Sequence, residues 1–177
     1  MRSTGEVLGL AETFPLAFYK SQEAAGSELP HAPAAWENKK VLISLSNKES
    51  QKDQVLMIGK TLKDLGFTLV GTQGTADFYN ANGIKCEVVN KIGGGRPDVV
   101  DLIMNKEVCL VINTPKAKRN YAEDRKTIRK VCLKYKVSYI TTLAGAVAAV
   151  KGIESVKNGN GGEGGVKSLQ EYHSLIK

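Results

Sequence analysis

From residue 40 onward, short apolar runs alternate with segments in which apolar residues recur every three or four positions. The first run, 41–45, precedes a helical pattern formed by Val55, Ile58, Leu62 and Leu65. The same unit recurs with predicted strands at 67–70, 86–89, 108–112 and 138–140. Apolar strands that alternate with helices are typical of parallel sheets covered on both sides. The pattern predicts an α/β fold: an open five-stranded parallel sheet with helices on both faces and right-handed crossovers.

The first 38 residues differ in residue pattern and composition from the rest of the chain. A short amphipathic stretch, 14–25, is followed by Gly26, Pro30, Pro33 and an Ala-Pro-Ala-Ala run. We therefore predict a boundary near residue 38, with 1–38 as a tail or linker and 39–177 as the main domain. Toward the other end, 158–165 is rich in glycine, which predicts a flexible loop before a short helix around 169–176.

Composition narrows the class of protein. A chain of 177 residues with 42% apolar and 24% charged residues is typical of one folded domain with an appendage. Cys86, Cys109 and Cys132 lie within or beside apolar segments, which predicts reduced core thiols. Only His31 and His173 could join them, so we expect no metal site. The chain has no apolar run long enough to cross a bilayer and no secretion signal, so we expect a cytoplasmic protein.

The net charge of +7 is concentrated in one segment. Residues 114–136 hold nine Lys or Arg and two acidic residues, so the rest of the chain is neutral. Within this segment an apolar stripe at helical spacing is formed by Ile128, Val131, Cys132 and Tyr135. We favour a solvated face of a helix that packs on the core over a nucleic-acid surface, because few aromatic side chains are present to stack on bases.

Polar side chains follow every predicted strand, and carboxylates are nearly absent among them. They are Ser46, Lys52, Thr72, Thr75, Lys91, Asn113 and Thr141. Ligands of parallel α/β sheets bind at the carboxyl ends of the strands, so these side chains are candidates for one site. Hydroxyl groups, glycines, a helix N-terminus and ammonium groups suit a phosphate dianion.

The best single motif is the run Gly-Thr-Gln-Gly-Thr at 71–75, in which we expect Thr75 to cap the following helix. Alone it is better interpreted as an ordinary turn between strand and helix, but Lys91 and Asn113 at neighbouring strand ends favour a site. Ser46 is either a ligand contact or a helix cap that forms a capping box with Glu49. The glycines at 93–95 are either part of the site or a flexible turn.

Segments spread over nearly the whole chain carry a specific resemblance. They are 1–7, 14–25, 71–76, 90–91, 95–97, 112–114, 134–137, 141–142 and 170–173. In this order they resemble the C-terminal end of the carbamoyl-phosphate synthetase large subunit. The resemblance implies that 1–38 is the tail of the second ATP-grasp domain and that 39–177 is an allosteric domain with a methylglyoxal-synthase-like fold.

The same resemblance implies a regulatory function without a catalytic site or cofactor in this chain. In this family the domain binds UMP as inhibitor or IMP as activator. The residues that match are Thr72, Thr75, Lys91 and Lys52 for the effector phosphate, Ser46 and Asn113 for ribose or base, and Tyr139 and Thr141 for part of an ornithine site. The remainder of that ornithine site lies in parts of the synthetase outside this chain, so we expect poor ornithine binding.

The resemblance also implies partners and a pathway. The partners are the rest of the large subunit and the glutaminase small subunit, with self-association through this domain and neither nucleic acid nor membrane. The full enzyme is an ATP-dependent, glutamine-hydrolysing ligase that supplies carbamoyl phosphate for pyrimidine and arginine synthesis.

Two positions depart from the family pattern. A third residue distinguishes between branches of the family. Pro115 stands where a Thr usually follows Asn-Thr, which removes a hydroxyl contact, and Gly94 stands where Glu is usual. Lys91 argues against the branch regulated by acetylglutamate, which lacks a lysine there.

Two alternatives remain within the same fold. A methylglyoxal-synthase-like phosphate lyase needs catalytic carboxylates, but those positions fall on Arg96 and Thr114. Asp98 and Asp101 lie nearby and are better interpreted as charges at a helix N-terminus. The other alternative is an oligomerisation or interface module that has lost effector binding.

Overall fold

The computed structural model describes residues 4–34, 37, 39–46, 49–114, 122–160, 167–174 and 176. In this part of the chain five strands form one sheet: β1 (Lys40–Ser44), β2 (Thr68–Thr72), β3 (Cys86–Val89), β4 (Val108–Asn113) and β5 (Ser138–Ile140). Their order is β3-β2-β1-β4-β5, and every neighbouring pair is parallel. The predicted open parallel sheet is therefore confirmed.

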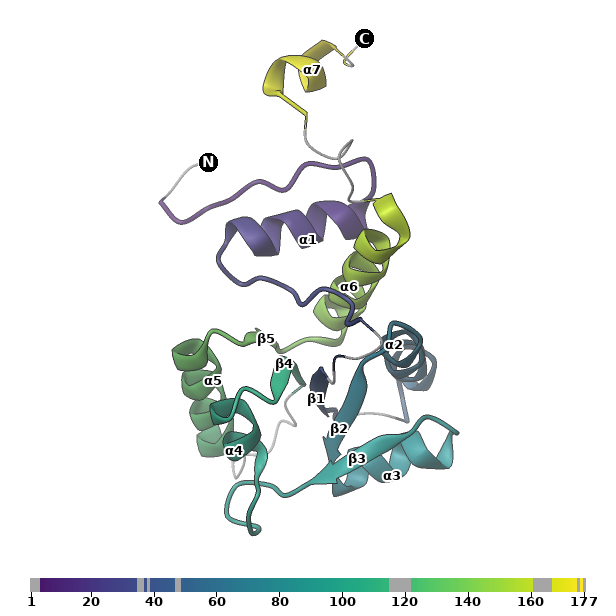
Figure 1. Cartoon of the computed structure of the whole chain (residues 1–177), viewed down its shortest axis with the longest axis vertical. Helices are drawn as coiled ribbons and strands as arrows, with labels where there is room; N and C mark the ends of the chain where they lie inside the picture. Colours follow the sequence, from purple (N-terminus) through teal and green to yellow (C-terminus); the bar gives the residue numbers. More distant parts are fainter. Residues whose placement is uncertain are drawn as a thin grey trace.

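Side chains alternate between the two faces of the sheet and enter two separate cores. On β1, Val41 and Ile43 belong to one apolar cluster, whereas Leu42 belongs to the other. The first cluster contains buried residues of α2 (Lys52–Asp64), α3 (Gln73–Ala81) and α6 (Leu143–Ser155). The second contains those of α4 (Val99–Met104) and α5 (Ala122–Tyr135). Helices thus cover both faces, as the sequence predicts (Figure 1).

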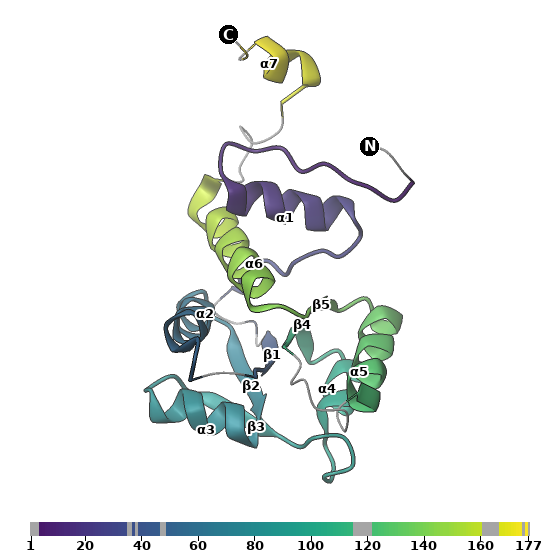
Figure 2. The same ribbon diagram turned by 180° about the vertical axis from the view of Figure 1, so that it is seen from behind.

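The N-terminal segment packs onto the main domain. Helix α1 (Phe14–Ala24) lies across α6, and both views show this arrangement (Figures 1 and 2). Gly152 permits the close approach, because a Cβ there would lie 2.9 Å from the carbonyl oxygen of Pro15 and 3.2 Å from Cβ of Tyr19. Tyr19 and Leu29 are buried in the first core cluster. The N-terminal segment therefore shares the first core cluster with the main domain.

The C-terminal elements lie at the same end of the molecule as α1, opposite the turn between β3 and α4 (Figures 1 and 2). Helix α6 is followed by a π-type turn, Val156–Asn160, so the predicted glycine-rich loop begins with ordered residues; 161–166 lie outside the described residues. The predicted last helix is α7 (Leu169–Ser174). The hydroxyl of Tyr172 donates to the carbonyl oxygen of Leu10 at 3.3 Å.

Two further predictions from composition can be compared with the structure. The cysteines are free thiols, and burial raises the pKa of Cys86 and Cys132 to about 12. Helix α5 buries the predicted apolar positions Ile128 and Cys132, and its basic residues Lys126, Arg129, Lys130 and Lys134 are exposed. Among the described residues, no helix combines the length and apolar character needed to span a membrane.

Candidate functional site at the carboxyl ends of the strands

A cavity of about 160 Å³ opens at the carboxyl ends of β1, β2 and β4. The turn after β3 and the first turns of α3, α4 and α5 complete its walls. Its polar lining is provided by Ser44, Ser46, Thr72, Thr75, Lys91, Asn113, Thr114, Asp124 and Arg125. Apolar side chains, such as Leu42 and Val111, form its floor.

Most of the residues that the sequence nominates come together here. Five of them line the cavity, namely Ser46, Thr72, Thr75, Lys91 and Asn113. Lys52 does not line it; this lysine begins α2 and its side chain is exposed. Tyr139 and Thr141 line a second cavity, of about 360 Å³, beside the end of α5.

The turn from β2 into α3 differs from the prediction in one detail. Helix α3 begins at Gln73, so Thr72 is its N-cap residue and Thr75 lies inside its first turn. The sequence-based assignment of Thr75 as the cap is therefore wrong. Thr75 is 3% exposed, and its hydroxyl oxygen accepts a hydrogen bond from the backbone N–H of Leu45 at 3.5 Å. The turn thus presents one threonine at the helix N-terminus and a second within its first turn.

Ser46 is not a helix cap. Helix α2 begins at Lys52 with Gln51 at its N-cap, so the predicted capping box with Glu49 does not form. Instead the backbone N–H of Ser46 donates to the hydroxyl of Thr114 at 2.9 Å. Thr114 in turn donates its backbone N–H to the carbonyl oxygen of Ser44 at 2.9 Å. Thr114 therefore joins the ends of β1 and β4 and holds Ser46 at the cavity.

Asn113 is 7% exposed at the end of β4 and connects the two cavities. Its amide nitrogen Nδ2 donates to the hydroxyl of Tyr139 at 3.2 Å. Burial raises the pKa of the Tyr139 phenol, so this hydroxyl is neutral near pH 7. The second cavity also contains Arg129 and Lys136, and none of its described lining residues is Asp or Glu.

The first turn of α5 contributes two charged residues that sequence reasoning did not assign to the site. Asp124 and Arg125 line the strand-end cavity together with Lys91 from the turn after β3. Two cations and one carboxylate therefore surround a space lined with hydroxyl groups. In the sequence, 115–121 separates these two residues from the end of β4, so they are not strand-end residues. Only their place on the basic segment pointed to them.

Comparison with known families agrees with this geometry. Residues 54–141, which run from α2 past β5, match the MGS-like domain family. The chain contains an MGS-like domain. It is 44% identical over 173 residues, 98% of its length, to the carbamoyl phosphate synthase large chain of Archaeoglobus fulgidus, covering 15% of that protein.

Two proteins named as the C-terminal section of this large chain are similar as well. The C-terminal section of the large chain from Methanopyrus kandleri is 44% identical over 157 residues, which are 89% of this chain and 28% of that protein. The corresponding section from Aquifex aeolicus is 39% identical over 177 residues, 99% of this chain and 31% of that protein. The chain thus spans less than a third of the length of these relatives.

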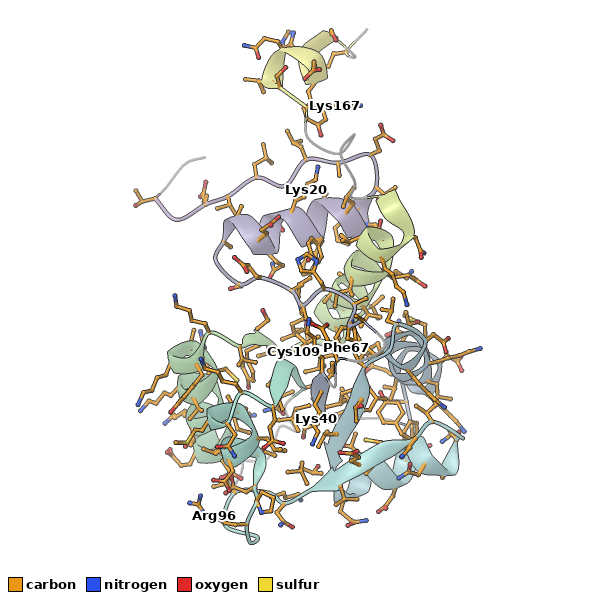
Figure 3. The ribbon with its side chains drawn as sticks, viewed as in Figure 1. Lys20, Lys40, Phe67, Arg96, Cys109 and Lys167 are labelled. Carbon is orange, nitrogen blue, oxygen red and sulfur yellow. The ribbon has the colours of Figure 1, made fainter. Side chains whose placement is uncertain are left out.

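The carboxylates near the MGS-like site have a structural role. Asp98 is the N-cap of α4 and forms a capping box with Asp101, as expected for charges at a helix N-terminus. Arg96 forms an ion pair with Asp101 and lies on the outer turn between β3 and α4, which Figure 3 labels. None of the three lines the strand-end cavity.

Of the two departures from the family pattern, Pro115 lies outside the described residues. Gly94 closes a tight turn, in which its N–H donates to the carbonyl oxygen of Lys91 at 2.9 Å. A Cβ at this position would lie 3.2 Å from that oxygen, a tight contact that a shift of a few tenths of an ångström would relieve. The turn keeps Lys91 at the cavity.

Proposed function

We propose that this chain is the allosteric domain of a carbamoyl phosphate synthase large chain and binds a nucleoside monophosphate, UMP or IMP, in the strand-end cavity. Similarity to large chains over nearly the whole sequence supports the protein family. The proposed regulatory function is supported by the residues that line the strand-end cavity.

The observation that carries the proposal is that Thr72, Thr75 and Lys91, which lie at the carboxyl ends of the neighbouring strands β2 and β3, line the same cavity. Thr72 is the N-cap of α3, where backbone N–H groups and the helix dipole favour an anion. Threonine hydroxyls and the lysine ammonium add the donors that a phosphate requires. Asn113 and Ser46 line the rest of the cavity and suit the hydroxyl-bearing part of a nucleotide.

Regulation would follow from linkage. A nucleotide changes catalysis in the full synthase only if it binds two states of the enzyme with different affinity. The isolated chain can then bind the effector, while its effect on carbamoyl phosphate synthesis requires the other domains and the glutaminase subunit. Self-association through this domain is a further expectation from the family.

We propose that ornithine binds poorly to this chain. Ornithine carries two ammonium groups, which need carboxylate partners. The cavity that contains Tyr139 and Thr141 has Arg129 and Lys136 as its charged lining instead. Carboxylates would have to come from the remaining domains of the synthase.

Calorimetric titration with UMP, IMP and inorganic phosphate tests the proposal. Lys91→Ala should weaken binding of all three ligands by roughly tenfold or more, because an ammonium group that bonds the phosphate is lost. Lys85→Ala is the matched control: Lys85 is exposed just before β3 and does not line the cavity.

The proposal fails if the wild-type chain binds neither nucleotide, or if Lys91→Ala binds both as tightly as Lys85→Ala does. Release of phosphate from dihydroxyacetone phosphate would favour the lyase alternative instead, with Asp124 as the carboxylate that lines the cavity.

A further inference from the structure

Tyr139 lies outside the strand-end cavity but is bonded to one of its walls. Its hydroxyl accepts from Nδ2 of Asn113 at 3.2 Å, and Asn113 lines the cavity. The two residues lie on neighbouring strands, since β4 pairs with β5 with Val111 opposite Tyr139. The bond therefore spans from the edge strand to the site.

This bond fixes the orientation of the Asn113 amide. An asparagine amide has a nitrogen that donates and an oxygen that accepts. Because one hydrogen of Nδ2 is directed at the Tyr139 hydroxyl, Oδ1 lies on the other arm of the amide and is left to accept, while Nδ2 keeps one further N–H. An acceptor attracts a hydroxyl or an N–H group and repels a phosphate oxygen.

The order of the strands separates this acceptor from the phosphate end. Thr72 and Thr75 follow β2 and Asn113 ends β4, and these strands flank β1 on opposite sides. Strands in a sheet lie about 4.8 Å apart, so the ends of β2 and β4 are separated by roughly 10 Å. A phosphate held by Thr72 at the end of β2 therefore lies nearer to β2 than to Asn113. A nucleotide, which is longer, would reach Asn113 through its sugar or base.

We propose that Tyr139 is a positioning residue for nucleotide recognition: it orients the Asn113 amide so that Oδ1 accepts from a hydroxyl of the nucleotide sugar. The inference rests on the proposed function. It gives Tyr139 a role in the strand-end site that is separate from the ornithine site implied by the family resemblance.

The test compares two ligands on one variant. Tyr139→Phe should weaken UMP and IMP binding roughly three- to tenfold, the worth of one hydrogen bond, and leave inorganic phosphate binding unchanged. Tyr135→Phe is the matched control, because Tyr135 packs against the same apolar cluster as Tyr139 but does not line the strand-end cavity. Thermal melting of both variants checks that the fold is intact.

A second variant makes the test specific to the Asn113 amide. On an Asn113→Ala background, Tyr139→Phe should cause no further loss of nucleotide affinity, because there is no amide left to orient. Equal nucleotide affinity of Tyr139→Phe and wild type would overturn the inference while leaving the proposed function intact. A loss of phosphate binding in step with nucleotide binding would also overturn it, since Tyr139 would then support the whole site. If the wild type binds phosphate and neither nucleotide, the proposed function and this inference both fail.

Discussion

At the scale of single residues, two hydroxyl groups hold the end of β1 in place. The backbone N–H groups of Leu45 and Ser46 donate to Thr75 and Thr114, which come from two different neighbouring strand ends. A hydroxyl that accepts from a backbone N–H keeps its own hydrogen for another acceptor. These bonds leave the Thr75 hydroxyl able to donate toward an anion in the cavity. The Thr114 hydroxyl also lies 3.4 Å from the hydroxyl of Ser46, and this pair keeps Ser46 at the cavity wall.

Thr114→Val should lower the free energy of unfolding by about 1–2 kcal/mol, because the N–H of Ser46 loses its partner. Thr114→Ser should restore most of the loss. Urea unfolding measures both, with Thr127→Val on the exposed side of α5 as control. The interpretation is wrong if the valine variant is as stable as that control.

At the scale of elements, the short helix α4 depends on its N-terminus. It has six residues, too few to be stable alone, and it begins with the capping box of Asp98 and Asp101. The side chain of Asp98 accepts from the N–H groups of Val100 at 2.8 Å and Asp101 at 3.1 Å. The helix in turn supports the turn after β3 that holds Lys91 at the cavity.

Asp98→Ala should therefore cost about 1 kcal/mol of stability and loosen the turn from 91 to 97. Asp64→Ala, an exposed carboxylate at the end of α2, is the comparison. Hydrogen exchange of the amides of 91–103 should rise in the first variant alone. Unchanged exchange there would show that the sheet, rather than the cap, orders this turn.

At the scale of the whole molecule, ligand binding and folding are linked. The cavity is formed by the ends of three strands and the starts of three helices, so it exists only in the folded chain. A ligand that binds the folded state alone must stabilise it. Both apolar clusters contribute side chains to the cavity wall, Leu45 from the first and Leu42 and Val111 from the second.

UMP or IMP at a concentration one hundred times its dissociation constant should stabilise the chain by about 2.7 kcal/mol. Denaturant unfolding with and without nucleotide measures the shift. For a tenfold or greater loss of affinity, the gain should fall to about 1.4 kcal/mol or less in Lys91→Ala at the same nucleotide concentration, and persist in Lys85→Ala. An equal gain in both variants would place the nucleotide outside the strand-end cavity.

Much of this architecture is readable from local patterns. Runs such as 41–45 and 108–112 are apolar on both faces of the strand. They predicted parallel strands, because only a sheet covered on both sides buries such runs. The cavity residues at the strand ends were readable for the same reason, since parallel strands bring their carboxyl ends to one edge. The start of α3 was missed, because a Thr fits both the N-cap and the first turn of a helix.

The sequence by itself determined the parallel α/β sheet and the polar side chains at its carboxyl edge, because periodicity and strand-end composition are local properties. Only the tertiary structure decided which of these residues meet. It put β1 between β2 and β4, excluded Lys52 from the cavity, and joined Ser46 to Thr114. It also brought Asp124 and Arg125 to the site and packed α1 on α6. The physical reason is that strand order and side-chain direction follow from packing between distant segments, which no local pattern along the chain encodes.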